Sequence, residues 1–548
     1  MSKETISTGE AIVRTLVREG VDTVFGIPGV QTYELFDALG RASDAIRLVA
    51  PRHEQAASYM AYGYAKATGR TGVYSVVPGP GVLNSTGGLC TAYGASAPVL
   101  CLTSEVPTPY IGIGLGHLHE LPDQLGTLRL LTKWAQRIGH PAEAPGLVAE
   151  ALRRAASGRP RPVALEAPWD VLGMRAPVGP DAGRETTGDP HGEPDGGAIE
   201  RLAGLLAGAR HPLIMVGGGA QHASAEVLAV AEHLQAPVVS FRSGRGVVSN
   251  EHHLGLTNAE GFELWERTDV VLGVGSRMEL MWFRWPDRPD GLKVATIDVD
   301  PAQPTRLGAS VAVTGDAAAS CRLLAQALAE RCEPRPSRAE ELGLLKSRVA
   351  ARVAEITPHA QFLGAIRDVL PRDGFLVEEI CQAGFAATYA LPFYEPRTYV
   401  SGGHQGALGF GFPTALGVKV AQPDRAVVSI TGDGGLQFGL QEFATAAQEG
   451  IGVVTVLFDN GAYGNVLRDQ QNLFEGREVA SRLRNPDWAT LAEGFGVAAH
   501  RATTPGELRD VLDRALADGA PALVHVPVDP ASERSPWPLL APPSRRSG

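Results

Sequence analysis

Two short apolar runs in the last quarter of the chain each end at acidic or amide residues, and they constrain the fold more than any other feature. The first run covers residues 426 to 430 (AVVSI) and leads to Gly432-Asp433-Gly434. The second covers residues 452 to 458 (GVVTVLF) and leads to Asp459-Asn460. Such runs predict buried strands, and the helical pattern from 440 to 448 between them favours a parallel α/β sheet. The carboxyl ends of the two strands would place Asp433 and Asn460 at one sheet edge.

A carboxylate and a carboxamide oxygen at one sheet edge are suited to a hard cation. Mg²⁺ prefers oxygen ligands and commonly shares its coordination shell with substrate phosphates. The glycines would let the backbone approach an anion, and the start of the following helix would add free N–H groups. The alternative is an ordinary strand-to-helix turn, because a GDG triplet alone is common in α/β proteins. We therefore predict a cation and diphosphate site at this edge, subject to a second observation.

That second observation lies far upstream, at Arg52-His53-Glu54-Gln55. A run of small residues follows from 56 to 67, then an apolar run from 73 to 77 and Pro78-Gly79-Pro80-Gly81. An acid ahead of a closely packed small-residue helix is a good place to bury a carboxylate. Alone, Glu54 would be interpreted as a helix N-terminal acid, worth a fraction of a kcal/mol. Together with Asp433 and Asn460 it favours a catalytic role.

The two regions also share one order of elements. Residues 53 to 104 run from a small-residue helix to a strand, a glycine-rich loop, a helix and a second strand, and residues 404 to 460 run the same way. The likeness predicts a duplicated α/β unit.

Length and composition limit the class of protein. A chain of 548 residues with 44% hydrophobic residues predicts about three domains with large cores. The net charge of -11 argues against nucleic acid or an anionic membrane as a partner. Five cysteines without a C-x-x-C pair indicate neither a zinc site nor a disulfide framework. The start lacks an apolar signal core, and no apolar run is long enough for a bilayer, so we expect a soluble cytoplasmic protein.

Shifts in composition predict the boundaries of three doubly wound, parallel-sheet α/β domains. The segment from 175 to 197 is rich in Pro, Gly and Asp, as a linker should be, and a second break lies near 333 to 339. Apolar runs at 213 to 219, 270 to 276 and 295 to 300 indicate buried parallel strands in the middle domain. Gly217-Gly218-Gly219 lacks a full G-x-G-x-x-G and is weak evidence for a dinucleotide loop. The predicted plan is an N-terminal domain (1–174), a linker (175–197), a central domain (198–332), a linker (333–355), a C-terminal domain (356–531) and a tail (532–548).

These motifs resemble the cofactor signature of thiamine diphosphate enzymes, which is a GDG triplet, some two dozen residues and two asparagines. The resemblance covers nearly the whole chain and is closest to the acetolactate synthase-like group. It is carried by Gly26-Ile27-Pro28-Gly29, Arg52-His53-Glu54-Gln55, Gly79-Pro80-Gly81 with Asn84, and Gly409-Phe410-Gly411-Phe412-Pro413. It implies thiamine diphosphate and Mg²⁺, with the metal bound by Asp433, Asn460 and the backbone carbonyl of Ala462. Asp459 stands where the first asparagine is usual.

The resemblance also implies roles for other residues. Glu54 would contact N1′ of the aminopyrimidine, the Gly406 carbonyl would receive the 4′-amino group, and Leu408 would wedge the cofactor into a V. The other implied cofactor-binding residues are Pro28, Asn84, Gly432, Gly434, Gly435, Tyr463 and Gly464. One copy of the duplicated unit binds the pyrimidine and the other the diphosphate, usually across a subunit interface, so a homodimer or homotetramer is implied.

Substrate-facing residues follow the family less closely. The resemblance and the sequence indicate catalytic roles for Glu54, His119, Gln124 and His404. His119-Glu120 stands where acetolactate synthases usually carry Phe-Gln-Glu, and Gln470 lies near the position of a tryptophan that shapes acceptor choice. Gln31 sits where benzaldehyde lyase has a histidine, and Val30 and Val77 align with the active-site serine and first histidine of benzoylformate decarboxylase. Leu256-Thr257-Asn258 replaces a Met-His-Gly run that helps bind FAD, which leaves FAD as an optional cofactor.

Several activities stay open at this point. The resemblance implies an enzyme, a transferase or lyase, that decarboxylates a small 2-oxo acid and ligates the product to a second carbonyl. The alternatives are release of an aldehyde without ligation, and cleavage of 2-hydroxy ketones or acyl-CoA thioesters. A protein of another class, a regulatory partner that binds the cofactor without turnover, is the last alternative. The Trp537 side chain is expected to anchor the proline-rich tail if that tail folds over the site.

Overall fold

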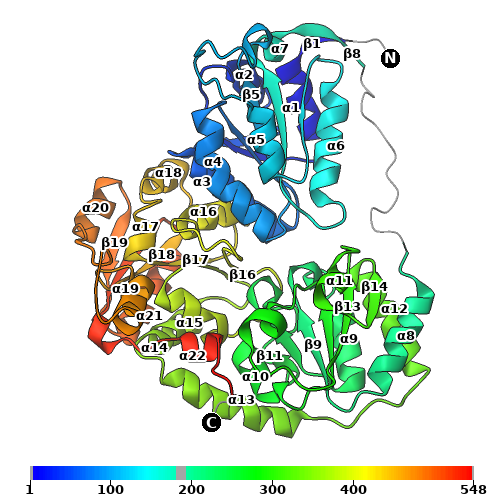
Figure 1. Ribbon diagram of the computed structural model, residues 1–548. Coiled ribbons are helices and arrows are strands. Elements are labelled where there is room, and N and C mark those ends of the chain that lie inside the picture. Colours follow the sequence, from blue (N-terminus) through cyan, green and yellow to red (C-terminus); the bar gives the residue numbers. More distant parts are fainter. Residues whose placement is uncertain (1–3, 180–192, 546–548) are drawn as a thin grey trace.

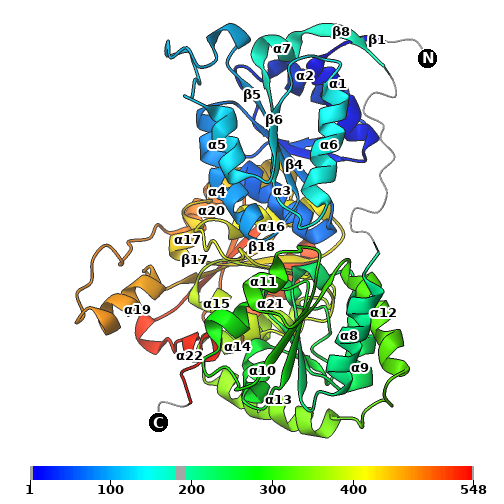
Figure 2. The same cartoon turned by 45° about the vertical axis from the view of Figure 1, so that its right-hand side comes forward.

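The computed structural model describes residues 4–179 and 193–545 and contains three α/β units, one after another along the chain (Figure 1). Each unit is built on a six-stranded sheet in which all neighbouring strands run parallel. Helices cover both faces of each sheet (Figures 1 and 2). The predicted fold class is therefore confirmed.

The N-terminal sheet has the order β3-β2-β4-β5-β7-β6. Its strands are β2 (Thr23–Gly26), β3 (Arg47–Val49), β4 (Gly72–Val76), β5 (Val99–Glu105), β6 (Ala135–Arg137) and β7 (Val163–Pro168). Its helices are α1 (Thr8–Arg18), α2 (Tyr33–Arg41), α3 (Glu54–Thr68), α4 (Pro80–Gly94), α5 (Gln124–Leu131), α6 (Ala144–Ala156) and α7 (Trp169–Gly173).

The central sheet has the order β11-β10-β9-β12-β13-β14, and its strand order reverses between β9 and β12. Its strands are β9 (Pro212–Val216), β10 (Val238–Ser240), β11 (Gly255–Leu256), β12 (Val270–Val274), β13 (Lys293–Asp298) and β14 (Val311–Thr314). Its helices are α8 (Gly196–Ala207), α9 (Ser224–Leu234), α10 (Asn258–Trp265), α11 (Gln303–Leu307) and α12 (Ala317–Ala329). Ligands of open α/β sheets bind beyond the strand ends at such a reversal.

The C-terminal sheet has the order β16-β15-β17-β18-β20-β19. Its strands are β15 (Phe375–Glu378), β16 (Tyr399–Val400), β17 (Val427–Gly432), β18 (Val454–Asp459), β19 (Ala498–Arg501) and β20 (Ala522–Pro527). Its helices are α14 (His359–Val369), α15 (Gln382–Ala390), α16 (Gly411–Ala421), α17 (Asp433–Leu436), α18 (Glu442–Glu449), α19 (Gly464–Leu473), α20 (Trp488–Gly494) and α21 (Pro505–Asp518). Its strands follow the same order as those of the N-terminal sheet, as the proposed duplication requires.

Parts of the predicted linkers and tail have regular structure. Residues 175 to 178 form β8 (Arg175–Val178), which pairs antiparallel with β1 (Glu4–Ser7). Most of the remaining first linker, 180–192, lies outside the described residues. Helix α13 (Ala339–Ala354) fills most of the second linker, and α22 (Trp537–Leu540) lies in the tail. None of the helices in the described part of the chain has the length and apolar character needed to cross a membrane.

The N-terminal and C-terminal units pack together through α3 and α16. Every residue from Ala56 to Ala67 is buried, and one hydrophobic cluster contains residues of both helices. The small residues are required here, because a Cβ on Gly63 would lie 2.1 Å from the Thr414 carbonyl oxygen and one on Gly417 would lie 2.0 Å from that of Met60. The helix that begins at Glu54 is thus fixed against the unit that carries Asp433.

Candidate active site

Asp433 and Asn460 follow two adjacent parallel strands, as predicted. Strands β17 and β18 are paired so that Gly432 lies opposite Phe458. Asp433 is 2% exposed, and its Oδ2 accepts a hydrogen bond of 2.7 Å from Asn485 Nδ2. Burial, together with the charge of Asp459, raises the pKa of Asp433 to about 6. A buried carboxylate of this kind is stabilised in its charged form by a nearby cation.

Asp459, which replaces the usual asparagine, organises this edge. Its Oδ2 accepts from Trp488 Nε1 at 2.8 Å and lies 3.0 Å from His525 Nε2, and its Oδ1 accepts from Asn485 Nδ2 at 2.7 Å. Burial would raise the pKa of Asp459, yet hydrogen bonds led by that from His525 lower it to about 2. Asn485 therefore bridges two carboxylates, one of which stays ionised.

Asn460 is held in one orientation by its neighbours. Its Oδ1 accepts from the Ala462 N–H at 3.2 Å, and its Nδ2 donates to Glu533 Oε2 at 2.9 Å. A Cβ on Gly464 would lie 2.6 Å from that amide nitrogen, so the glycine makes room for it. Likewise, a Cβ on Gly434 would lie 2.6 Å from the Tyr463 ring. The backbone on both sides of the edge is thus packed closely, with Tyr463 and Gly464 at the start of α19.

Glu379 holds the loop that precedes α16 through hydrogen bonds to its backbone. It directly follows β15 and is 1% exposed. Its carboxylate accepts from the Gly409 N–H at 3.0 Å and the Gly411 N–H at 2.7 Å. Burial raises the pKa of Glu379 to about 7 against these two bonds. Gly406 and Leu408, the residues expected to bind and wedge the aminopyrimidine, lie on the loop that Glu379 holds.

The residues expected to meet the pyrimidine lie on the N-terminal unit. Glu54 begins α3 and is partly buried, and its Oε2 accepts from Asn84 Nδ2 at 3.1 Å. Asn84 on α4 and Pro28 after β2 are exposed, as is the neighbouring Leu83, at 46%. The structure brings Glu54 and Asn84 together and leaves this group open on one face of the chain.

The loop between β5 and α5 carries His119 and is tied to Gln31. The Gln31 side chain is completely buried, and its Nε2 donates to the Leu118 carbonyl at 2.9 Å while its Oε1 lies 3.2 Å from His119 Nδ1. Both Gln31 and His119 have positive φ, at 78° and 69°. Burial and the neighbouring His117 lower the pKa of His119, so its imidazole is neutral near pH 7.

The Gln124 side chain makes three hydrogen bonds within the N-terminal unit. Its Oε1 accepts from the Gly79 N–H at 2.8 Å, and its Nε2 donates to the Ser104 carbonyl at 2.7 Å and to Glu166 Oε2 at 3.0 Å. The side chain is 1% exposed. This arrangement suits a residue that positions the strand ends and the loop more than one that touches a substrate.

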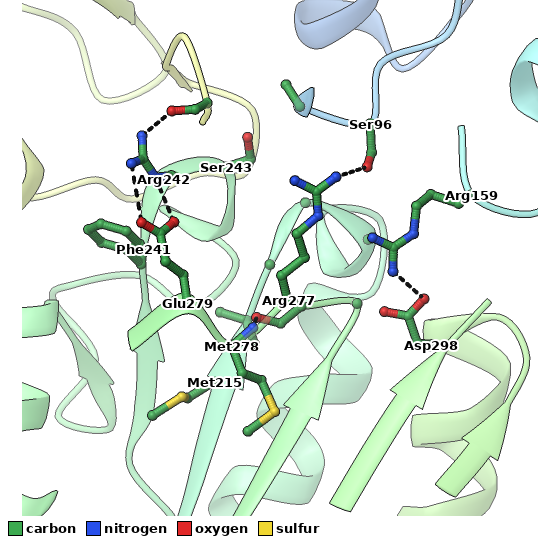
Figure 3. A pocket seen from close by; sticks show the side chains of 18 of the residues that line it. Ser96, Arg159, Met215, Phe241, Arg242, Ser243, Arg277, Met278, Glu279 and Asp298 are labelled. Atoms are coloured by element: carbon green, nitrogen blue, oxygen red, sulfur yellow. Dashed lines mark hydrogen bonds and ion pairs between the residues drawn. The ribbon is translucent and has the colours of Figure 1, made fainter. Parts of the chain in front are cut away.

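A separate cavity of about 170 Å³ opens where the central sheet reverses (Figure 3). Gly217 to Gly219 and Gly275 line its floor, and a Cβ on Gly217 would lie 2.3 Å from the Gly275 carbonyl oxygen. Lys66 reaches the cavity from α3 and is 6% exposed, and Arg277 donates to Ser96 Oγ at 3.3 Å. Burial lowers the pKa of Lys66 to about 8 and that of Arg277 to about 10.

His404 also lines this central cavity. Its Nδ1 lies 3.2 Å from Glu279 Oε2, and Glu279 is paired with Arg242 and Arg284. Burial lowers the pKa of His404 to about 4 although Glu279 opposes the shift, so the imidazole is neutral. The structure thus places His404 beside Glu279, and its predicted catalytic role stays a prediction.

Comparison with known proteins identifies the family. Residues 6–127, 199–324 and 379–526 match the N-terminal TPP binding domain, the central domain and the C-terminal TPP binding domain of thiamine pyrophosphate enzymes. A probable 2-ketoarginine decarboxylase of Pseudomonas aeruginosa is 35% identical over 94% of this chain and 92% of its own length. The chain belongs to the thiamine pyrophosphate enzyme family. The predicted family is confirmed.

Other relatives of this thiamine pyrophosphate enzyme are acetolactate synthase subunits. A probable large subunit of Methanocaldococcus jannaschii is 33% identical over 95% of this chain and 92% of its own length. The isozyme 3 large subunit of Escherichia coli is 31% identical over 94% of this chain and 92% of its own length. The protein is therefore a thiamine pyrophosphate-dependent enzyme of the acetolactate synthase-like group, whose chemistry is carboligation or decarboxylation.

The donor set at the β17 and β18 edge fits a magnesium diphosphate. Within residues 4–179 and 193–545 no group of three or more His, Cys, Asp or Glu side chains could hold a metal. The edge offers instead the Asp433 carboxylate, the Asn460 amide oxygen and backbone carbonyls, which is the oxygen chemistry that Mg²⁺ accepts while it keeps phosphate ligands. Gly432, Gly434 and Gly435 are buried there, and a Cβ on Gly435 would lie 2.9 Å from Glu379 Cγ.

Several residues of the site were missed from the sequence. Glu379 follows an apolar strand, as Asp433 does, so the same strand-end criterion could have found it. Asn485 and Glu533 carry no local signal, because they reach the edge from 52 and 73 residues away from Asp433 and Asn460.

Proposed function

We propose that this enzyme uses thiamine diphosphate and Mg²⁺ to decarboxylate a small 2-oxo acid and ligates the resulting acyl carbanion equivalent to a second carbonyl. The observation that carries the proposal is the side-by-side placement of Asp433 and Asn460 at the ends of β17 and β18. Release of the aldehyde without ligation is the second candidate, and the similarity to a probable 2-ketoarginine decarboxylase favours it.

The Mg²⁺ ion would be bound by the Asp433 carboxylate, Asn460 Oδ1 and the Ala462 carbonyl. These oxygens come from two strand ends that Asn485 joins by hydrogen bonds to Asp433 and Asp459. The cation would favour the ionised form of Asp433, whose burial is otherwise costly.

Bound thiamine diphosphate supplies a nucleophilic carbon that adds to the substrate carbonyl. The protein's own part is positioning and proton exchange. Glu54 would hold a proton at N1′ of the aminopyrimidine, and the Gly406 carbonyl would accept from the 4′-amino group. Leu408 would be the wedge against the bound cofactor and would keep water away from it. His119, neutral and held by Gln31, would face the substrate, with Gln124 positioning its loop.

Self-association would complete the site. Asn84 and Pro28 are exposed and Glu54 is partly exposed, and Leu83 beside Asn84 and Tyr33 at the start of α2 are 46% and 52% exposed. On the C-terminal unit Phe438, Val466, Leu473 and Phe474 are more than half exposed around α17 and α19. Exposed apolar groups of this kind favour an interface. We therefore propose a homodimer or a homotetramer in which each site uses two chains.

The central cavity is proposed to bind a phosphate-bearing nucleotide, with FAD as one candidate. Lys66 is a buried cation and Arg277 a partly buried one, and their charge favours an anion above Gly217 to Gly219. Heat denaturation of the purified protein followed by mass spectrometry of the released small molecules tests this. Release of a nucleotide or flavin in near-equal amount supports the proposal, and its absence after supply of both kinds contradicts it.

The main proposal is tested by carbon dioxide release from a panel of 2-oxo acids. The protein is first reconstituted with thiamine diphosphate and Mg²⁺, and products are identified by mass spectrometry. A coupled product establishes the carboligase and names its donor, whereas an aldehyde alone establishes the decarboxylase. No release from any acid would contradict both and direct attention to cleavage of 2-hydroxy ketones or acyl-CoA thioesters.

A further inference from the structure

The proposed metal ligand Asn460 has an unusual neighbour from the C-terminal tail. Glu533 directly follows the short helix Pro530–Ser532, and its Oε2 accepts from Asn460 Nδ2 at 2.9 Å. Its other oxygen, Oε1, lies 2.9 Å from His359 Nε2. His359 is 1% exposed and packs edge-on against the Phe458 ring of β18. A single carboxylate therefore joins the amide of Asn460 to a buried imidazole.

The position of Glu533 is fixed by the docked tail. The Arg534 N–H donates to the Thr357 carbonyl at 2.8 Å, and Tyr389 Oη donates to the Pro536 carbonyl at 2.8 Å. Trp537 packs against Phe385 and donates from Nε1 to Asn465 Oδ1 at 2.7 Å. Figure 1 shows α22 beside α15. The tail is thus part of the folded unit next to the β18 edge.

The contact with Glu533 determines which end of the Asn460 amide can face a cation. An asparagine side chain presents oxygen on one side and NH₂ on the other, and only the oxygen can bind a cation. A carboxylate offers acceptors alone, so the NH₂ group must face Glu533. His359 donates to the second oxygen and keeps the carboxylate from turning. Groups that orient a metal ligand in this way are a recurrent part of metal sites.

We propose that Glu533, held by His359, is a positioning residue that fixes the Asn460 amide with Oδ1 available to the cation. This inference rests on the Mg²⁺ site proposed above. It gives the tail a defined role in the site, through a ligand of the metal rather than through contact with substrate.

The test is the Mg²⁺ affinity of the full-length protein at saturating thiamine diphosphate, measured by calorimetry. Glu533→Gln keeps the size of the side chain but lets an NH₂ group face Asn460. We expect it to weaken Mg²⁺ binding about 10- to 100-fold, the usual effect of removing such a partner. Arg534→Ala is the matched control, because the described contact of Arg534 to the unit is made by its backbone N–H, and it should leave the affinity unchanged.

A second pair of variants distinguishes an effect on the orientation of the Asn460 side chain from an effect on folding. In Asn460→Asp both terminal atoms are oxygens, so orientation no longer matters. Adding Glu533→Gln to Asn460→Asp should then not weaken Mg²⁺ binding, and should strengthen it because two facing carboxylates are reduced to one. A purely structural role would weaken binding in both backgrounds, which would overturn the inference even if Glu533→Gln alone folds poorly.

The outcomes for the two proposals are distinct. If the wild-type protein binds Mg²⁺ and Glu533→Gln binds it equally well, the positioning role is wrong and the metal site stands. If the wild-type protein shows no Mg²⁺ binding that depends on thiamine diphosphate, the metal site itself is wrong and this inference fails with it.

Discussion

At the scale of single residues, Glu54 is the side chain on which turnover should depend most. Glu54→Gln keeps the size and the contact with Asn84 but removes the proton that the aminopyrimidine needs. We expect carbon dioxide release to fall about 10²- to 10⁴-fold, the usual worth of a positioned acid or base. Thiamine diphosphate affinity, measured by calorimetry, should change little. Glu200→Gln on α8, at a side chain that is 52% exposed, is the control and should retain full activity. Surviving activity in Glu54→Gln would contradict the proposed activation.

Glu379 should make the stability of the C-terminal unit depend on pH. Burial raises the pKa of Glu379 from its ordinary 4.5 to about 7 in the folded state. Because the folded state prefers the protonated acid, this residue's contribution to stability declines as pH rises from about 4.5 to about 7. The decline is at most about 3 kcal/mol at 1.36 kcal/mol per pKa unit.

Glu379→Gln removes that titration, so relative to the wild type it should be more stable at pH 7.5 than at pH 5. Urea unfolding at both pH values measures the difference, with Glu200→Gln as the exposed control. An equal difference between Glu379→Gln and wild type at the two pH values would show that Glu379 does not titrate in this range.

At the scale of elements, the contact between α3 and α16 joins the two units that bind the cofactor. A methyl group on Gly63 would lie 2.1 Å from a backbone oxygen of α16, so the helices must separate. Gly63→Ala should cost about 2 kcal/mol or more, seen as a lower melting temperature and as reduced cofactor affinity. Gly364→Ala on α14 is the matched control, since a Cβ there meets nothing within 4 Å. It should stabilise the helix by up to about 1 kcal/mol, and a loss as large as that of Gly63→Ala would show that the contact with α16 is not the cause of the effect.

The elements also explain how much of this protein could be predicted from its sequence. Buried parallel strands are apolar along their whole length, so β17, β18 and the residues at their ends were predictable, and with them Asp433 and Asn460. Side chains that arrive from elsewhere were not, because Asn485 and Glu533 are placed by the docking of loops and tail. The position of the His404 side chain was likewise not predictable from the sequence. Its sequence places it near the cofactor loop, whereas its side chain pairs with Glu279 of the central unit.

At the scale of the whole molecule, the proposed shared site would draw on two groups of residues that lie on different units of the chain. The N-terminal unit leaves Glu54 and Asn84 on an open face, and the C-terminal unit buries Asp433 beside Asn460. Both halves carry exposed apolar side chains. In the proposed assembly, a two-fold pair of chains would place the N-terminal half of each beside the C-terminal half of the other. Figure 2 shows α19 projecting from the body of the chain, on the C-terminal half.

A shared site can be tested by distributing two inactivating changes between chains. Glu54→Gln disables the N-terminal half and Asp433→Ala the C-terminal half, so each variant alone should be inactive. A hybrid dimer isolated through two different tags, with one change on each chain, should regain about half of wild-type activity, because one of its two sites contains no change. The control is a hybrid of a wild-type chain with a chain carrying both changes. Its two sites each contain one change, so it should be inactive. If each site were instead built within one chain, the two hybrids would exchange behaviour, and activity in the control hybrid alone would overturn the shared site.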